Sequence, residues 1–223
     1  MFSRRLYTTF LLALALVHVG HFGCSGKPIE EQDPGDIYKA AEEDVASDHY
    51  LLAVDKYRLI KNKYPYSKYA LDAQLRLADV YYLQESYTEA ALAYESFRDL
   101  HPKHEKVAYA MFRAGESYYK DIPEPLARDL TPATKAIDAL RDFINRFPAD
   151  PNATQAKTDL ADCRRLLAEK ELYIANFYYK RNFFDSAKGR FKKIIDLYPE
   201  TKAAKESEEK LAKIDHDSLH NQE

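Results

Sequence analysis

Apolar side chains recur every three or four positions from residue 36 to about residue 214, with charged residues between them. This spacing gathers the apolar residues on one face of a helix, whereas a half-buried strand would require strict alternation. Only two glycines follow residue 36, and no Asn-Gly or Asp-Gly pair marks a hairpin. The pattern therefore predicts an all-α protein.

Every second predicted helix ends in the same way, at an aromatic residue followed by proline. This pair occurs at Tyr64-Pro65, Phe147-Pro148 and Tyr198-Pro199, and in weaker form at His101-Pro102. This spacing fits the 34-residue tetratricopeptide repeat, which pairs two helices. The template requires small residues at positions 8 and 20, where the paired helices approach closely. The small residues found there are Ala41, Ala53, Ala78, Ala90, Gly115, Ala136, Ala175 and Ala187.

We therefore predict a tetratricopeptide-repeat superhelix (an α-solenoid) over residues 35–214, with about four helix pairs and a C-terminal capping helix. The repeats are expected near residues 34–67, 68–103, 104–150 and 152–199, with a partial fifth at 201–214. An insertion at 121–129 delays the second helix of the third repeat. Residues 152–180 contain no helix breaker and predict one long helix. Residues 215–223 are predicted to form a disordered tail.

The N-terminal residues have the pattern of a bacterial export signal. Arg4 and Arg5 precede an apolar run over residues 6–19, which is too short to span a bilayer comfortably. The sequence Gly23-Cys24-Ser25 follows. We therefore expect residues 1–23 to be a signal peptide.

The residues around the cleavage point resemble a lipoprotein signal, in which the cysteine is acylated and becomes the new N-terminus. Cys24 is then the lipid attachment site, and residues 24–34, which are polar and contain two prolines, form a flexible tether. Ser25 favours sorting to the outer membrane. His21 stands where the lipoprotein pattern has an aliphatic residue, so an ordinary secretory signal with a free Cys24 is the alternative.

Charge and residue types narrow the functional class. The chain carries 33 Lys and Arg against 36 Asp and Glu, a net charge of −3, which argues against nucleic-acid binding because that depends on a basic face. Neither His101 with His104 nor His216 with His220 has a carboxylate or thiol at metal-site spacing. Nucleophile–base motifs and glycine-rich phosphate loops are absent, so we predict no catalysis, no cofactor and no metal. Cys163 is expected to be a packing residue.

The repeat template also predicts a binding groove, because positions 5, 9 and 12 of each first helix face the concave side. Position 5 gives Tyr38, Leu75, Phe112 and Leu172; position 9 gives Glu42, Asp79, Glu116 and Asn176; position 12 gives Val45, Tyr82, Tyr119 and Tyr179. An aromatic row beside an acidic row suits an extended or helical peptide with aromatic anchors. Alternatively, some of these tyrosines seal neighbouring helix pairs.

Three stretches of the sequence resemble the outer-membrane protein assembly factor BamD family. They are YPYSKYALDAQLRLADVYY (64–82), RDLTPATKAIDALRDFINRFP (128–148) and AEKELYIANFYYKRNFFDSAKGRFKKIIDLYP (168–199). Members of that family are lipoproteins of about five tetratricopeptide repeats, and this chain ends within what would be the fifth. The inserted third-repeat loop and the long helix are part of the likeness.

The resemblance implies a lipid-anchored scaffold on the periplasmic face of the outer membrane. Its partners would be a BamA-type barrel-forming assembly protein, other subunits of the assembly complex, and unfolded outer-membrane protein precursors. The family's arginine implicated in the BamA contact corresponds to Arg190, nine residues before Pro199. Without the resemblance, an arginine on a lysine-rich helix is most simply a solvated side chain.

A second functional class remains open at this point. Cell-envelope coordination proteins of the CpoB or YbgF kind have similar terminal repeats and act with the Tol-Pal system or peptidoglycan. The lipoprotein-like Cys24, the insertion at 121–129 and the lack of an N-terminal coiled-coil segment favour the assembly scaffold.

Overall fold

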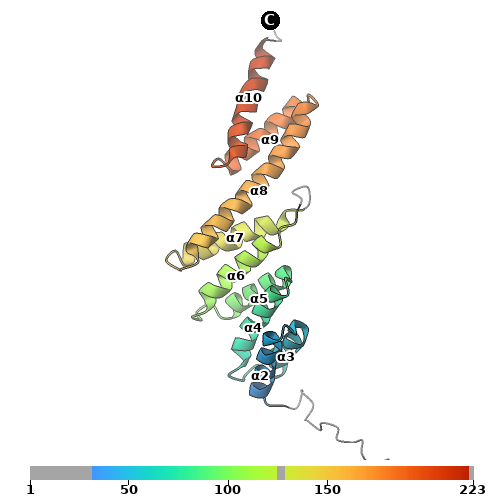
Figure 1. Cartoon of the computed structure of the whole chain (residues 1–223). Helices are drawn as coiled ribbons and strands as arrows, with labels where there is room; N and C mark the ends of the chain where they lie inside the picture. Colours follow the sequence, from blue (N-terminus) through green and yellow to red (C-terminus); the bar gives the residue numbers. More distant parts are fainter. Residues whose placement is uncertain (1–31, 125–128, 221–223) are drawn as a thin grey trace, which may run out of the picture.

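The computed structural model describes residues 32–124 and 129–220, and within them the chain is helical throughout. The helices are α2 (Pro34–Ala46), α3 (Tyr50–Lys63), α4 (Ala70–Leu83), α5 (Tyr87–Leu100), α6 (Val107–Lys120), α7 (Thr131–Arg146), α8 (Ala153–Lys180), α9 (Phe184–Leu197) and α10 (Lys202–His220). Each helix packs mainly against the next along the chain, and α8 also touches α6 and α10. The result is an elongated tetratricopeptide-like solenoid with α2 and α10 at opposite ends (Figure 1).

The small residues predicted at positions 8 and 20 are all buried at the helix crossings. Ala41 and Ala53 in the first repeat and Ala78 and Ala90 in the second have no exposed surface. The large residue at position 24 fills the space beside each pair and is also fully buried. These residues are Tyr57, Tyr94, Leu140 and Phe191. Small and large side chains therefore alternate along the repeats, and the buried residues form four successive hydrophobic clusters.

The turn between the two helices of a repeat has the same left-handed residue in three repeats. Asp48, Glu85 and Asn182 have φ values of 59°, 59° and 62°. The next residue in each turn donates its amide to the carbonyl five positions earlier: His49 to Asp44 at 2.8 Å, Ser86 to Tyr81 at 2.9 Å and Phe183 to Tyr178 at 3.0 Å. This is the hydrogen bond of a Schellman helix ending, which requires a left-handed residue. The insertion at 121–129 replaces this turn in the third repeat.

The long helix is confirmed, since α8 runs unbroken over Ala153–Lys180. Cys163, on α8, is completely buried in the core of the third repeat and packs as expected. The predicted C-terminal boundary is wrong, because α10 continues to His220 and residues 215–220 are helical rather than disordered. The apolar pattern stops near residue 214, but α10 continues through a polar segment that contains neither proline nor glycine.

Candidate functional site

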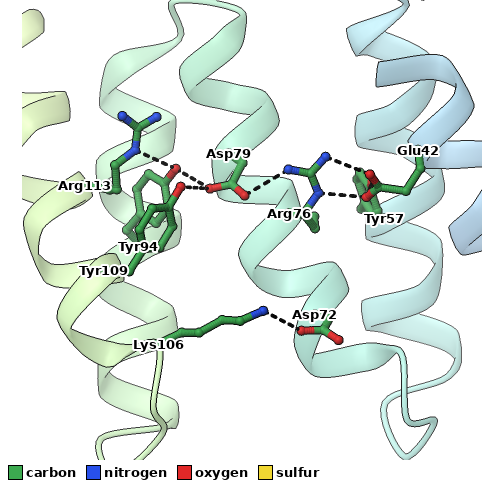
Figure 2. A network of polar contacts seen from close by, with 9 residues as sticks. All are labelled: Glu42, Tyr57, Asp72, Arg76, Asp79, Tyr94, Lys106, Tyr109 and Arg113. Carbon is green, nitrogen blue, oxygen red and sulfur yellow. Dashed lines mark hydrogen bonds and ion pairs between the residues drawn. The ribbon is translucent and has the colours of Figure 1, made fainter. Parts of the chain in front are cut away.

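A ladder of polar side chains crosses the first three repeats. Its charged members alternate in sign along the stack: Glu42 on α2, Arg76 and Asp79 on α4, and Arg113 and Glu116 on α6. Three tyrosines, Tyr57, Tyr94 and Tyr109, complete it, and Figure 2 shows all of these residues except Glu116. We call these eight residues the polar ladder. Its three acids are the predicted position-9 residues, and its arginines stand three positions earlier, at position 6.

The first rung of the polar ladder joins repeats one and two. Arg76 donates from Nε to Glu42 Oε1 at 2.7 Å and from Nη2 to Oε2 at 2.9 Å, a bidentate pair. The same guanidinium donates from Nη1 to Asp79 Oδ2 at 3.2 Å. Tyr57 donates its hydroxyl to Glu42 Oε1. Because a bidentate pair fixes distance and angle together, this rung sets how α4 lies against α2.

The second rung joins repeats two and three through one carboxylate. Asp79 Oδ1 accepts from the Tyr94 hydroxyl at 2.7 Å and from the Tyr109 hydroxyl at 2.8 Å. Arg113 donates from Nη1 to Glu116 Oε2 at 2.6 Å. Its guanidinium carbon also lies 3.6 Å from the centre of the Tyr82 ring. Asp72 and Lys106 add an exposed pair between α4 and α6, at 3.2 Å.

The surroundings of Glu42, Tyr94 and Tyr109 keep these members of the ladder in their hydrogen-bonding form. Burial opposes ionisation of Glu42, but hydrogen bonds from Arg76 and Tyr57 outweigh it and lower its pKa below the ordinary value of 4.5. Burial raises the pKa of Tyr94 well above 10 and that of Tyr109 to about 12. The hydroxyls therefore stay protonated and donate across the physiological range. Since its acids already have donors, the ladder stabilises the repeats and leaves little charge for a ligand.

The ladder does not continue into the fourth repeat. Its position-9 residue is Asn176, whose amide nitrogen donates to Glu206 on α10 at 3.3 Å. Its position-24 residue is Phe191, which has no hydroxyl to donate, and the side-chain oxygen of Asn176 is buried without a hydrogen bond. In the first two repeats the acid at position 9 therefore accepts from the tyrosine at position 24, whereas the fourth repeat has an amide and a phenylalanine at these positions.

A cleft of about 1190 Å³ adjoins the far end of the ladder. Tyr119 on α6 and the following Ile122 and Pro123 form one wall, and Leu166 and Tyr173 on α8 contribute to the other. Charged side chains also line it: Lys120, Glu124, Arg165, Glu169 and Lys170. The volume exceeds the roughly 300–1,000 Å³ of small-molecule sites, and the mixture of apolar walls and both charges suits a peptide.

The predicted groove is only partly present. Tyr119 lines the cleft, with its hydroxyl 3.2 Å from Asp162 Oδ2. Leu75 and Phe112 are 4% and 6% exposed and belong to the core, so the prediction that they line an accessible face is wrong. Leu75 packs in a cluster with Ala110 and Ala114 of α6, and the Phe112 ring lies 5.6 Å from the Phe143 ring of α7.

Two other predicted groove tyrosines are held by internal contacts. Tyr38 is half-buried and packs against the rings of Tyr57 and Tyr69, with centroids 5.6 Å apart in both cases. Tyr82 has one ring face covered by Arg113 and its edge against Tyr87. The alternative interpretation, that tyrosines seal neighbouring helix pairs, therefore applies to this part of the row.

Arg190 lies on α9, in the fourth repeat. It donates from Nη1 to Glu171 Oε2 on α8 at 2.9 Å, and Lys193 donates to the other oxygen at 2.6 Å. Burial opposes ionisation of Glu171, yet the two cationic donors lower its pKa. About a third of the Arg190 side chain (36%) is exposed. The guanidinium is thus oriented by α8 and keeps one edge in solvent.

The proposed lipid site, Cys24, lies outside the described residues. None of the described helices is both long and apolar enough to cross a membrane. Over residues 32–124 and 129–220, no three side chains of His, Cys, Asp or Glu gather as a metal site would require.

Sequence reasoning identified the ladder's acids but missed their partners. The missed residues are Arg76, Arg113, Tyr57, Tyr94 and Tyr109. A signal was present, because the position-6 arginines occur only in the second and third repeats, where each can face an acid of its own or the preceding repeat. The cleft residue Tyr173, which is 73% exposed, also stands at position 6. It was missed because only positions 5, 9 and 12 were expected to face the groove.

Comparisons with known proteins find similarity over nearly the whole chain. The sequence pattern of the YfiO family, described as outer membrane lipoprotein, matches residues 30–218. The outer membrane protein assembly factor BamD of Vibrio cholerae is 29% identical over 208 residues, which cover 88% of this chain and 85% of that protein. BamD of Neisseria gonorrhoeae is 28% identical over 216 residues, covering 92% and 81%. BamD of Caulobacter vibrioides is 28% identical over 196 residues, covering 85% and 64%.

Proposed function

Because this chain belongs to the YfiO family of outer membrane lipoproteins, we propose that it is an assembly factor for outer-membrane β-barrel proteins. In this role it is a scaffold without catalytic activity, attached through acylated Cys24 to the periplasmic face of the outer membrane. It binds a BamA-type barrel-forming protein and other complex subunits, and it receives unfolded barrel precursors. The similarity to proteins named assembly factors over more than four-fifths of the chain supports this proposal.

The structural observation that carries the proposal is the cleft between α6 and α8. Tyr119 and Tyr173 stand on its opposite walls, with Leu166 between charged neighbours. Barrel precursors end in aromatic strands, and tyrosine rings bind aromatic side chains over a large area at a low cost in conformational entropy. We assign precursor binding to this cleft rather than to the ladder, whose acids already have internal donors.

Replacing both Tyr119 and Tyr173 by alanine should weaken binding of a peptide with a C-terminal aromatic strand by about tenfold or more. Each buried aromatic anchor contributes on the order of 1 kcal/mol or more to such a complex. Fluorescence anisotropy of a labelled peptide measures the affinity. Tyr66→Ala is the matched control, because Tyr66 is a fully exposed tyrosine on the turn between α3 and α4, away from the cleft. Unchanged affinity in the folded double variant would rule out the cleft.

Arg190 is proposed as a contact to the barrel-forming protein. Its exposed edge and its fixed orientation against Glu171 suit a bidentate interaction with a partner carboxylate. Lys193 also pairs with Glu171, but its ammonium group cannot make a planar bidentate contact with a carboxylate. Substituting Lys193 therefore removes only a contact to Glu171, whereas substituting Arg190 also removes the proposed contact to the partner.

A further inference from the structure

The turn that joins repeats two and three contains histidine at two positions where the other repeats have different side chains. We call residues 101–106 the α5–α6 turn. The residue before the proline is His101 here but aromatic in the other repeats, which have Tyr64, Phe147 and Tyr198. The second residue after the proline is His104 here but a short polar residue elsewhere, namely Ser67, Asp150 or Thr201. Only the α5–α6 turn therefore has side chains at these positions that take up protons near neutral pH.

His104 accepts a backbone hydrogen bond that a carboxylate accepts in the next repeat. The Lys106 amide donates to Nδ1 of His104 at 3.1 Å. In the turn before α8, the Asn152 amide donates in the same way to Asp150 Oδ1 at 2.8 Å. Because an amide N–H can only donate, Nδ1 of His104 must be without a proton. A proton on Nδ1 would turn the acceptor into a second donor, and the bond to Lys106 would be lost.

The two imidazole rings pack against one buried phenylalanine. The Phe97 ring, which is 1% exposed, lies 5.1 Å from the His101 ring and 5.4 Å from the His104 ring, measured between centroids. Nε2 of His101 donates to Gln74 Oε1 on α4 at 2.9 Å. Burial, and after it the charge of His104, lower the pKa of His101 below the ordinary value of 6.5. The packing therefore favours neutral rings.

Charged side chains around the α5–α6 turn are paired with one another. Lys106 of the turn pairs with Asp72 of α4 at 3.2 Å (Figure 2), and on α5 Arg98 pairs with Asp99 at 2.7 Å. The first titratable side chains of α6, Tyr109 and Arg113, belong to the polar ladder. The turn itself adds two exposed side chains of opposite charge, Lys103 and Glu105. Over the described residues, none of these carboxylates accepts a hydrogen bond from either imidazole.

We propose that the α5–α6 turn is an acid-sensitive junction between repeats two and three. Protonation of His104 releases the Lys106 amide, and repulsion between two charged imidazoles moves them away from the Phe97 ring. The start of α6 at Val107 then opens locally more often. Because α6 carries part of the polar ladder and one wall of the cleft, acid loosens the connection between them and repeats one and two. This inference goes beyond the proposed function and does not depend on it.

The test measures amide hydrogen exchange by NMR on residues 24–223, which include all of the described core side chains, from Ile37 to Ile214. After correction for the intrinsic effect of pH on exchange, the protection of the Lys106 amide should fall by at least about threefold from pH 7.5 to pH 5.5. The Asn152 amide is the internal control, because its acceptor is a carboxylate and carboxyl groups ordinarily titrate below this range. Its protection should stay constant.

His104→Asn separates protonation from the loss of the acceptor. An asparagine side-chain oxygen accepts the amide two residues later and does not titrate, so H104N should keep its Lys106 protection at pH 5.5. His49→Asn is the matched control, because His49 is exposed at the turn between α2 and α3; this variant should lose the protection as the wild type does. In H104N the pKa of His101 should also rise, since the charge that lowers it is removed.

Two results would overturn the proposal. One is equal protection of the wild-type Lys106 amide at both pH values, a measurement that needs no variant. The other is the same loss of protection in H104N as in the wild type, which would assign the effect of acid to another group.

Discussion

Replacing Arg76 by methionine should lower the free energy of unfolding by about 2 kcal/mol. The substitution keeps much of the side-chain volume but removes the two hydrogen bonds to Glu42 and the one to Asp79. Removing one partner of a hydrogen-bonded charged pair costs roughly 1.5–3 kcal/mol in total when the other group is left buried. Glu42 is 38% exposed in its side chain, so water replaces part of the loss and the lower end of the range applies. Urea denaturation followed by circular dichroism measures the change.

Arg141→Met is the control for this substitution. Arg141 pairs with Asp138 on the same helix at 3.4 Å, with side chains 51% and 71% exposed. Such a surface pair contributes about 0–1 kcal/mol. If R76M and R141M destabilise the protein equally, the polar ladder has no special part in holding the repeats together.

The cost of R76M should depend on pH in a direction set by Glu42. In the folded protein the pKa of Glu42 lies below its ordinary 4.5, so the pair stabilises the folded state above that pH. The stabilisation is lost as the pH falls through the lower pKa of the folded state. The difference in unfolding free energy between wild type and R76M should thus be complete at pH 7 and shrink below about pH 4.5. A constant difference down to pH 3 would contradict this assignment.

Gly115→Ala should destabilise the protein by about 1–2 kcal/mol, although alanine is the better helix former. An added Cβ would stand 2.6 Å from Leu140 Cδ2 and 3.3 Å from the Leu140 backbone nitrogen, where α6 crosses α7. Overpacking a closed core costs about 1–3 kcal/mol, which exceeds the gain of up to about 1 kcal/mol from replacing a helical glycine. The midpoint of urea unfolding reports the net effect.

Gly189→Ala provides the opposite expectation. No atom lies within 4 Å of the position of its added Cβ, so only the helix-propensity gain remains and the variant should be more stable by up to about 1 kcal/mol.

Leu140→Ala should also remove the penalty of Gly115→Ala when both are present, because the clashing side chain is gone. A destabilising effect of Gly115→Ala that persists in the double variant would rule out the contact with Leu140 as its cause.

The fold was largely predictable because its main determinants are local in sequence. Ala41, Ala53 and the other small residues at positions 8 and 20 mark where helices cross, and proline marks where they end. The left-handed turn residues Asp48 and Glu85 were not predicted, since neither is glycine and only the repeat register shows that they are equivalent. The end of α10 was also missed, because a polar helix carries no apolar pattern.

The candidate site was less predictable because it depends on contacts between repeats. The template placed Glu42 and Asp79 on one face correctly, but it could not show that Arg76 reaches both of them. It treated Leu75 as facing a groove, whereas the neighbouring repeat buries this side chain. The opposition of Tyr119 and Tyr173 across the cleft arises from the insertion and the long α8, which the standard repeat does not contain.

Affinity capture from a detergent-solubilised cell envelope tests the proposed assembly function most directly. We predict that the tagged chain co-purifies with a large β-barrel protein carrying tandem periplasmic domains. Arg190→Glu should strongly reduce this recovery, whereas Lys193→Glu, which breaks the same internal pair with Glu171, should leave most of it. Recovery of Tol or Pal components without a barrel-forming protein would contradict the proposal and favour the envelope-coordination class.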